Sequence, residues 1–223
     1  MRSLPLPLAL TARLTPVAVL ACAGWAMSSG PLTETQDTAG RETQQTQSEK
    51  ASSDPSSAAV SKTYAAAPVP CTSVTTKTVT ALVPGAKTAG KEIPSTDVDL
   101  RRTCSWNALK GYDYRWLDIS FEITDSDAAA QSSYKERIRE KSGGGAVPGL
   151  GNAAYSVVNL TTEDKQQTRE GVVIAQVSNA LVVVNYNGSD FESKKAPGTD
   201  EINKGAIKAA KEAVAALQNG KKS

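Results

Sequence analysis

The sequence predicts an α+β domain in which helices pack against an antiparallel sheet of about five strands, with one disulfide. Apolar and polar residues alternate in several stretches between residues 100 and 186, and glycines and polar turn residues separate these stretches. The C-terminal stretch instead follows a helical period. Three cysteines are present, which suffices for one bridge and one further role.

Residues 1–22 have the layout of an export signal of the lipoprotein type. Arginines precede a short apolar run, residues 14–21, and Val-Leu-Ala leads into Cys22. The run is shorter than the roughly 20 residues that span a membrane. Val-Leu-Ala-Cys resembles a bacterial lipobox, so we expect Cys22 to be acylated. The alternative is ordinary secretion after cleavage near Ala23 or Ala26.

The segment that follows, residues 23–67, is rich in Ser, Thr, Gln, Glu, Ala and Pro, and from about residue 28 it has almost no large apolar residue. Such a segment cannot bury enough surface to offset its ordering entropy, so it is predicted to be a disordered polar tether. Residues 68–218 are predicted to form the extracytoplasmic domain, and residues 219–223 a flexible tail.

The net charge of the chain indicates which classes of partner it can bind. The net charge of +2 comes from the arginines of the signal, so the mature protein is near neutral. The basic footprint of a nucleic-acid binder is therefore missing, and we expect no nucleic acid as partner. The expected partners are the membrane, through the N-terminal lipid anchor, and an unknown envelope ligand or protein.

The domain begins with a short helix. Val79 and Leu82 stand among threonines, Thr75 can cap the helix, and Pro84-Gly85 ends it. Residues 86–99 show no clear period and are predicted to be an irregular connection.

Two strands come next, residues 100–106 and 112–124, with residues 107–111 as their turn. One face of the second strand carries Leu117, Ile119, Phe121 and Ile123, and the other carries Trp116, Asp118, Ser120 and Glu122. This alternation predicts a sheet that is buried on one side and wetter on the other.

The remaining elements follow in order. A helix over residues 127–141 is capped by the Asp125-Ser126-Asp127 side chains, and a strand covers residues 154–160. A valine-rich hairpin joins residues 171–177 to 181–186. The terminal helix has an apolar stripe that should cover one face of the sheet, made of Ile202, Ala206, Ala209, Ala213 and Leu217.

Catalytic and cofactor motifs are weak. The chain has no histidine, which excludes Ser-His-Asp and Cys-His catalysis and leaves a metal ligand set short, so we expect no metal and no cofactor. Gly149-x-Gly151-x-x-Ala154 has the spelling of a dinucleotide fingerprint, but a strand follows it where the fingerprint needs a helix. These glycines are predicted to be turn residues.

One face of the second strand is the candidate for function. Asp118 and Glu122 could serve a hydrolase, although scattered acids on an exposed face are usually only solvated. Tyr114 and Trp116 lie on the same side and form a possible binding face, because amphipathic aromatics serve binding surfaces. The alternative is that the terminal helix covers them.

Cys71 and Cys104 are predicted to form the disulfide. In an oxidising compartment two cysteines of a small domain more often bridge than stay free; the alternative is two buried free thiols. Closing a loop of this length would stabilise the fold by roughly 3 to 4 kcal/mol in the chain-entropy model. We also expect Trp106 to pack near the bridge.

Three features together resemble a known family. Pro70-Cys71 precedes a short helix, Cys104-Ser105-Trp106 lies in a strand, and a Gly-Leu-Gly-Asn-Ala-Ala-Tyr loop, residues 149–155, precedes the hairpin and the terminal helix. This combination resembles the actinobacterial lipoproteins that carry domain of unknown function 3558, over about residues 68–218. Asn152 stands where many members carry Asp.

The resemblance implies an envelope location and an α+β domain, and the molecular activity of the family is not established. The general plan is also similar to extracellular sensor domains of actinobacterial Ser/Thr kinases. The sequence thus favours a non-enzymatic cell-envelope lipoprotein that binds a ligand or partner. A secreted envelope hydrolase that uses carboxylates and a structural accessory subunit are the alternatives.

Overall fold

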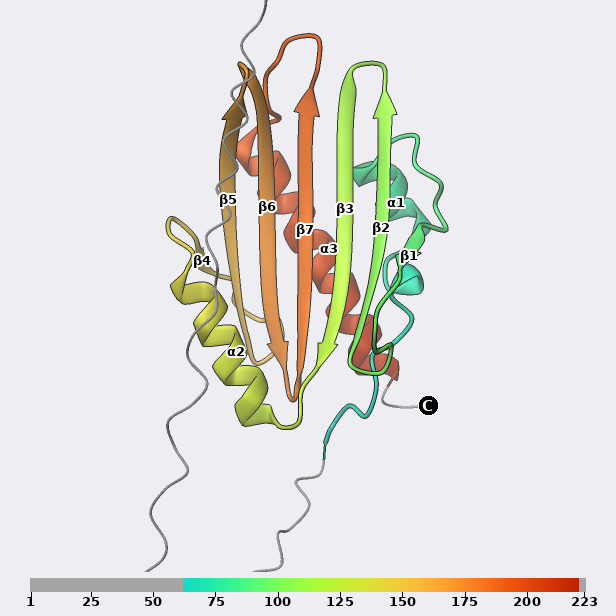
Figure 1. Ribbon diagram of the computed structural model, residues 1–223, viewed down its shortest axis with the longest axis vertical. Helices are drawn as coiled ribbons and strands as arrows, with labels where there is room; N and C mark the ends of the chain where they lie inside the picture. The colour runs from blue at the N-terminus through green and yellow to red at the C-terminus, as the bar shows by residue number, and fades with distance from the viewer. Residues whose placement is uncertain (1–61, 221–223) are drawn as a thin grey trace, which may run out of the picture. The chain divides into compact units, whose positions relative to one another are not determined.

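The computed structural model describes residues 62–220. Cys22, the predicted export signal and most of the predicted tether lie outside the described residues. The described part is an α+β domain with one antiparallel sheet of seven strands in the order β1-β2-β3-β7-β6-β5-β4 (Figure 1). The strands are β1 (Lys91–Ile93), β2 (Arg101–Lys110), β3 (Asp113–Ile123), β4 (Gly145–Ala146), β5 (Ala153–Glu163), β6 (Gln166–Val177) and β7 (Ala180–Asp190), and the helices are α1 (Thr76–Leu82), α2 (Asp127–Arg139) and α3 (Thr199–Gly220).

The predicted fold class and the disulfide are confirmed, but the predicted strand count of about five is wrong. The five long strands were all expected. The two additional strands, β1 and β4, have three and two residues and lie at the two edges of the sheet. Strands this short cannot show a period of two, and β1 falls within residues 86–99, which were expected to be irregular.

Several predicted boundaries also change, and β5, β6 and β7 all extend beyond their predicted ranges. β2 continues to Lys110, so the expected turn over residues 107–111 shortens to Gly111 and Tyr112. The domain starts before residue 68, because Tyr64 is buried and its backbone N–H and C=O both bond the side chain of Asn179, at 2.9 Å each. At the other end, α3 continues to Gly220.

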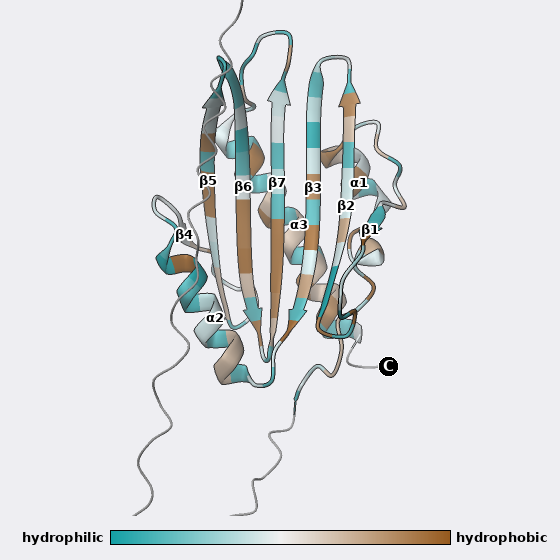
Figure 2. Cartoon of the chain, in the orientation of Figure 1, coloured by the Kyte–Doolittle hydropathy of each residue, from teal (hydrophilic) through white to brown (hydrophobic). Residues whose placement is uncertain are grey.

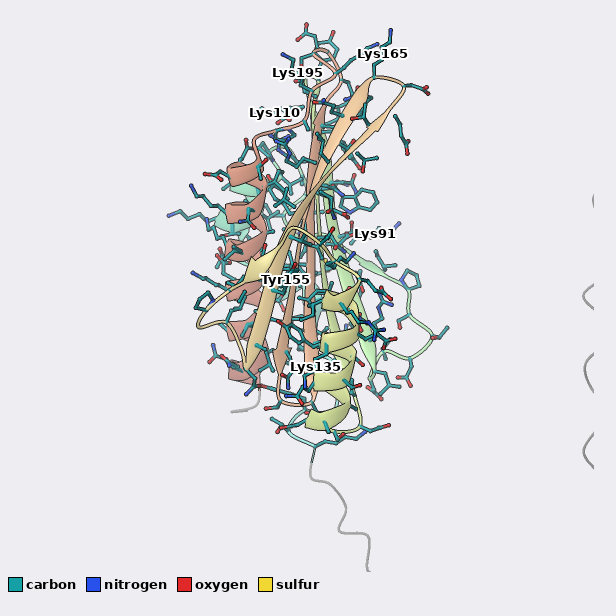
Figure 3. The ribbon with its side chains drawn as sticks, turned by 90° about the vertical axis from the view of Figure 1, so that its left-hand side faces the viewer. Lys91, Lys110, Lys135, Tyr155, Lys165 and Lys195 are labelled. Atoms are coloured by element: carbon teal, nitrogen blue, oxygen red, sulfur yellow. A yellow bond between two sulfur atoms is a disulfide. The ribbon has the colours of Figure 1, made fainter. Side chains whose placement is uncertain are left out.

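Helices lie on both faces of the sheet. α3 crosses one face, over β6 and β7, and α1 lies on that same side, whereas α2 lies on the opposite side (Figures 1 and 3). The predicted alternation of β3 is confirmed, because Leu117, Ile119 and Phe121 are fully buried in the core that includes α1 and α3. Figure 2 shows the alternation of apolar and polar residues as bands of brown and teal along the long strands.

α3 packs closely because glycines stand at its contacts. A Cβ on Gly171 of β6 would lie 2.9 Å from Ile202 Cγ2, and one on Gly205 would lie 2.6 Å from the ring of Tyr186. The same tyrosine donates its hydroxyl to the carbonyl of Leu82, at 2.8 Å, at the end of α1. These contacts join α1, α3 and β7 into one layered core.

Glu212 links α3 to the start of α1. Its carboxylate accepts a hydrogen bond of 2.8 Å from the backbone N–H of Thr75 and one of 2.5 Å from the hydroxyl of Thr78. Burial acts to raise the pKa of Glu212, but the hydrogen bonds from Thr78 and Thr75 outweigh it, so this pKa lies below its ordinary value. The ionised form is therefore the one that the fold stabilises.

The disulfide joins Cys71, in a 3-10 turn (Pro70–Thr72), to Cys104 in β2, with their Cα atoms 5.1 Å apart. A Cβ on Gly90 would lie 2.6 Å from both Cys104 Sγ and Trp106 Nε1, so the bridge and this indole both pack against Gly90. The indole N–H donates to the carbonyl of Thr88, at 3.0 Å. The expectation that Trp106 packs near the bridge is confirmed.

Candidate binding face

Tyr114 and Trp116 lie on the face of the sheet that α3 does not cover. Arg115, between them, points the other way and donates to Glu201 of α3 at 2.8 Å. Side chains alternate across a strand, so the neighbours of Arg115 point away from α3. The alternative in which the terminal helix covers Tyr114 and Trp116 is therefore wrong.

α2 covers only one end of that face. Its Tyr134 packs into a small apolar cluster with Val172, Ile174 and Leu181, and its Arg137 pairs with Glu122 of β3 at 2.5 Å. Towards the other end of the long strands no helix of residues 62–220 lies over this face (Figure 1). This uncovered part carries the side chains that could meet a ligand.

The strand register aligns these side chains in two rows. The first row crosses five strands and the second crosses three of them. We call the eight residues of the two rows the open face: Asn107, Trp116, Asn187, Glu170 and Asn159 in the first row, and Ser105, Asp118 and Asn185 in the second. Neighbouring strands are about 4.8 Å apart, so the first row is about 19 Å long.

Trp116 lies in the first row between Asn107 and Asn187, and its side chain is held in place. Its indole N–H lies 2.7 Å from Asp118 Oδ1 and 2.8 Å from Ser105 Oγ. The residue is still 38% exposed. Because the only donor of the indole is engaged, the ring offers its apolar surface, in a fixed orientation, to whatever binds there.

The amides of the open face differ from those of three asparagines elsewhere in the domain. Asn152 accepts from the N–H of Ser178, Asn179 holds the backbone of Tyr64, and Asn203 bonds Ser156. In contrast, the hydrogen bonds found within residues 62–220 include none from the side-chain amides of Asn107, Asn159, Asn185 and Asn187. Each of these four can therefore donate and accept towards solvent or a ligand.

Aromatic and apolar side chains continue the open face at the tips of β2 and β3. The rings of Tyr114 and Phe191 lie 6.0 Å apart between centroids. Phe191 and Leu109 are exposed, and so is Tyr112 in the turn beside them. Burial, followed by the nearby charge of Asp118, raises the pKa of Tyr114, so this hydroxyl is neutral at physiological pH.

Two hollows flank the open face. One, of about 470 Å³, lies towards β1 and is lined by residues that include Ile93, Thr103 and Asn185. The other, of about 530 Å³, lies towards the β5–β6 turn and is lined by residues that include Thr168 and Glu170. Both volumes are within the range of small-molecule sites.

The candidate catalytic carboxylates do not face each other. Asp118 and Glu122 are four residues apart on β3, which is about 13 Å along a strand. Glu122 is also engaged by Arg137 and lies 3.8 Å from Arg101. Paired glycosidase carboxylates are about 5 to 9.5 Å apart, so these two do not form such a pair.

The glycine-rich loop is a turn, as expected. β5 begins at Ala153, directly after the loop, so no helix opens behind Gly149 and Gly151. Both glycines have positive φ, and a Cβ on Gly151 would lie 2.4 Å from the carbonyl oxygen of Gln176. Close backbone packing against β6 accounts for Gly151.

Within residues 62–220 no cluster of three or more Cys, Asp or Glu residues could hold a metal ion. None of the helices in this part of the chain combines the length and apolar character needed to cross a bilayer. Cys22, the predicted lipidation site, lies outside the described residues.

Comparisons with known proteins leave the family open. No family model matches the sequence, and no curated protein matches it. Among solved structures, similarity is found to a crystal structure from Bacteroides thetaiotaomicron VPI-5482, with a TM-score of 0.34 and 10% identity over 53% of this chain and 46% of that chain. It is also found to the extracellular domain of PknH from Mycobacterium tuberculosis, with a TM-score of 0.29 and 12% identity over 53% of this chain and 64% of that one. The chain thus spans less than two thirds of either, and neither similarity carries an argument about function.

Proposed function

We propose that the protein is a non-enzymatic, extracytoplasmic binding domain, anchored to the cell membrane through Cys22, and that it binds an envelope component with its open face. The observation that carries this proposal is the arrangement of the open face. Long strands of a seven-stranded sheet present Trp116 and unpaired amides where no described helix covers them. Sites built on rigid strands keep their side chains in a fixed geometry, which lowers the entropy cost of binding.

The proposed location rests on three features that agree with one another. The first 22 residues read as an export signal that ends in a lipobox-like cysteine. The domain carries the Cys71–Cys104 disulfide, and disulfides persist in oxidising compartments. The predicted tether between them would, as a flexible coil, allow the domain to lie about 30 to 40 Å from the anchor.

The attachment of the chain suits a binding role for the open face. The described part begins beside Asn179, in the β6–β7 turn, where the amide holds Tyr64. Asn187 lies eight residues further along β7, which is about 27 Å away from that turn. Trp116 and Asn187 therefore lie in the half of the sheet that is remote from the attachment point.

Co-sedimentation tests the proposed function. The full chain with Cys22→Ala is mixed with envelopes from cells that express the gene, and bound protein is measured after centrifugation. We expect this parent protein to bind the envelopes. The further double substitution Asn185→Lys/Asn187→Lys should reduce the binding several-fold. The matched control, Gln218→Lys/Asn219→Lys, adds the same charge at the exposed end of α3 and should bind like the parent. Equal binding by all three proteins would contradict the proposal.

Metabolic labelling tests the anchor separately. A fatty-acid analogue should label the wild-type protein and should not label Cys22→Ala. Labelling that persists in the variant would exclude Cys22 as the acylated residue.

A further inference from the structure

The open face presents uncharged groups that both donate and accept hydrogen bonds. Four of its eight residues are asparagines with available amides, namely Asn107, Asn159, Asn185 and Asn187. A primary amide has two donors and an acceptor oxygen, and a hydroxyl likewise donates and accepts. Rows of amides therefore complement a ligand that carries many hydroxyl groups.

Trp116 adds an apolar platform within the same rows. The register places Asn107 on one side of it and Asn187 on the other. Its N–H is already bound to Asp118 and Ser105, so the ring can contribute only its apolar surface. A ligand that suits this combination has apolar C–H surfaces next to hydroxyl groups, as sugar rings do.

Charge narrows the class of ligand. The two rows contain two charged side chains, Asp118 and Glu170, and both are acidic; Lys91 stands beyond Ser105 on the edge strand β1. Phosphate-rich polymers and anionic lipid surfaces need basic side chains, which the rows do not supply. A protein partner would favour an apolar interface core, but the exposed apolar side chains of Leu109, Tyr112 and Phe191 lie beyond the rows. Apart from Trp116, the rows themselves consist of amides, two carboxylates and one hydroxyl.

We propose that the open face binds a neutral oligosaccharide that lies across the strands, with one sugar ring stacked on Trp116 and hydroxyls bonded to the flanking amides. This inference rests on the proposed function, because it names the ligand class for the same face. The first row is about 19 Å long, so the ligand is an oligosaccharide of several units and not a single sugar. The two hollows border the rows, one at Glu170 and Asn187 and the other at Asp118 and Asn185, and they give room for parts of the ligand that extend beside the rows.

Isothermal titration tests the ligand class. The full chain with Cys22→Ala is titrated with neutral oligosaccharides of hexoses, pentoses and N-acetylated amino sugars, with a polyanionic oligosaccharide and with a basic peptide. We expect saturable binding to at least one neutral class. Trp116→Ala should weaken that binding by about tenfold or more, as truncation of a central aromatic anchor does. Trp116→Phe should retain most of it, because a ring remains.

The control variant is Leu160→Ala. Leu160 is also exposed, but it pairs with Arg169, which points to the α3 side and bonds the carbonyl of Pro197. This variant should bind like the parent. Thermal unfolding of each variant confirms that a loss of binding does not come from a loss of folding.

The outcomes separate the two proposals. Binding of only the polyanion or only the peptide, or no binding of any neutral class at millimolar concentration, would overturn the carbohydrate inference. If envelope co-sedimentation still depends on Asn185 and Asn187 in that case, the open face remains a binding surface with a different ligand. If co-sedimentation does not depend on them either, both proposals are wrong.

Discussion

The two faces of β3 differ residue by residue. Leu117 and Ile119 are fully buried on the side of α1 and α3, whereas Trp116 and Asp118 stand on the open face, one exposed and one half-buried. The packed face holds its polar groups in defined bonds, such as that of Tyr186 to Leu82. On the open face the asparagine amides have no such bonds within the described part of the chain.

This difference separates the residues that stabilise the fold from the residues that are available for binding. Substitutions on the packed face should change stability, because they remove buried contacts or crowd close ones. Substitutions on the open face should leave stability almost unchanged and change binding instead. The following predictions test that division.

The largest expected effect is loss of the disulfide. Replacing Cys71 and Cys104 together by alanine opens a loop with a sequence separation of 33 and should lower the free energy of unfolding by about 3 to 4 kcal/mol in the chain-entropy model. Urea denaturation measures this value. A decrease below about 1 kcal/mol would show that the bridge contributes little beyond the packing around Trp106.

A second substitution tests the close contact of α3 with β7. Gly205→Val should destabilise the fold by about 1 to 3 kcal/mol, because any Cβ there meets the ring of Tyr186 at 2.6 Å. Gly220→Ala, on the same helix but with open space around it, is the control and should be close to neutral. Equal effects of both on the melting temperature would contradict the described packing.

The third prediction concerns pH. Glu212→Gln should cost about 1 kcal/mol at neutral pH, because Thr75 and Thr78 donate to the carboxylate. The folded-state pKa of Glu212 is lowered, so its contribution is present above the unfolded-state pKa of about 4.3 and is lost as the pH falls through the folded-state pKa. Wild type and variant should therefore converge in acid. A difference in unfolding free energy that stays constant from neutral pH down through this range would refute this role.

The smallest expected effect is on the open face. Asn107→Ala and Asn187→Ala should each change the free energy of unfolding by no more than about 0.5 kcal/mol, since neither residue lies in the core and neither side chain is hydrogen-bonded within the described residues. Chemical denaturation measures these values. A loss of several kcal/mol for Asn187→Ala would mean that this amide supports the fold.

Much of the packed face could be predicted from the sequence. The alternation around Leu117 and the apolar stripe of α3 follow periods that are local in the chain, so the sequence shows them directly. The edge strands could not be predicted, because β1 and β4 are too short for a period and form only through pairing with β2 and β5.

The candidate site was predicted only in part. Tyr114 and Trp116 were identified, but the asparagines beside them were not. The register that puts Trp116 next to Asn187 joins residues that are far apart in the sequence, and only tertiary pairing fixes it. A local signal did exist, since Asn185 and Asn187 flank the buried Tyr186 in the strand pattern, but the predicted strand ended at residue 186 and left Asn187 out.

Side-chain amide resonances give the most direct test of the central claim, that the open face is the binding surface. In ¹⁵N–¹H spectra of the full chain with Cys22→Ala, soluble fragments of the envelope should shift the NH₂ signals of Asn107, Asn185 and Asn187. The NH₂ signals of Asn152 and Asn179, whose side chains are engaged in the fold, should stay in place. Shifts confined to Asn152 and Asn179, or no shifts at all under conditions of binding, would contradict the claim.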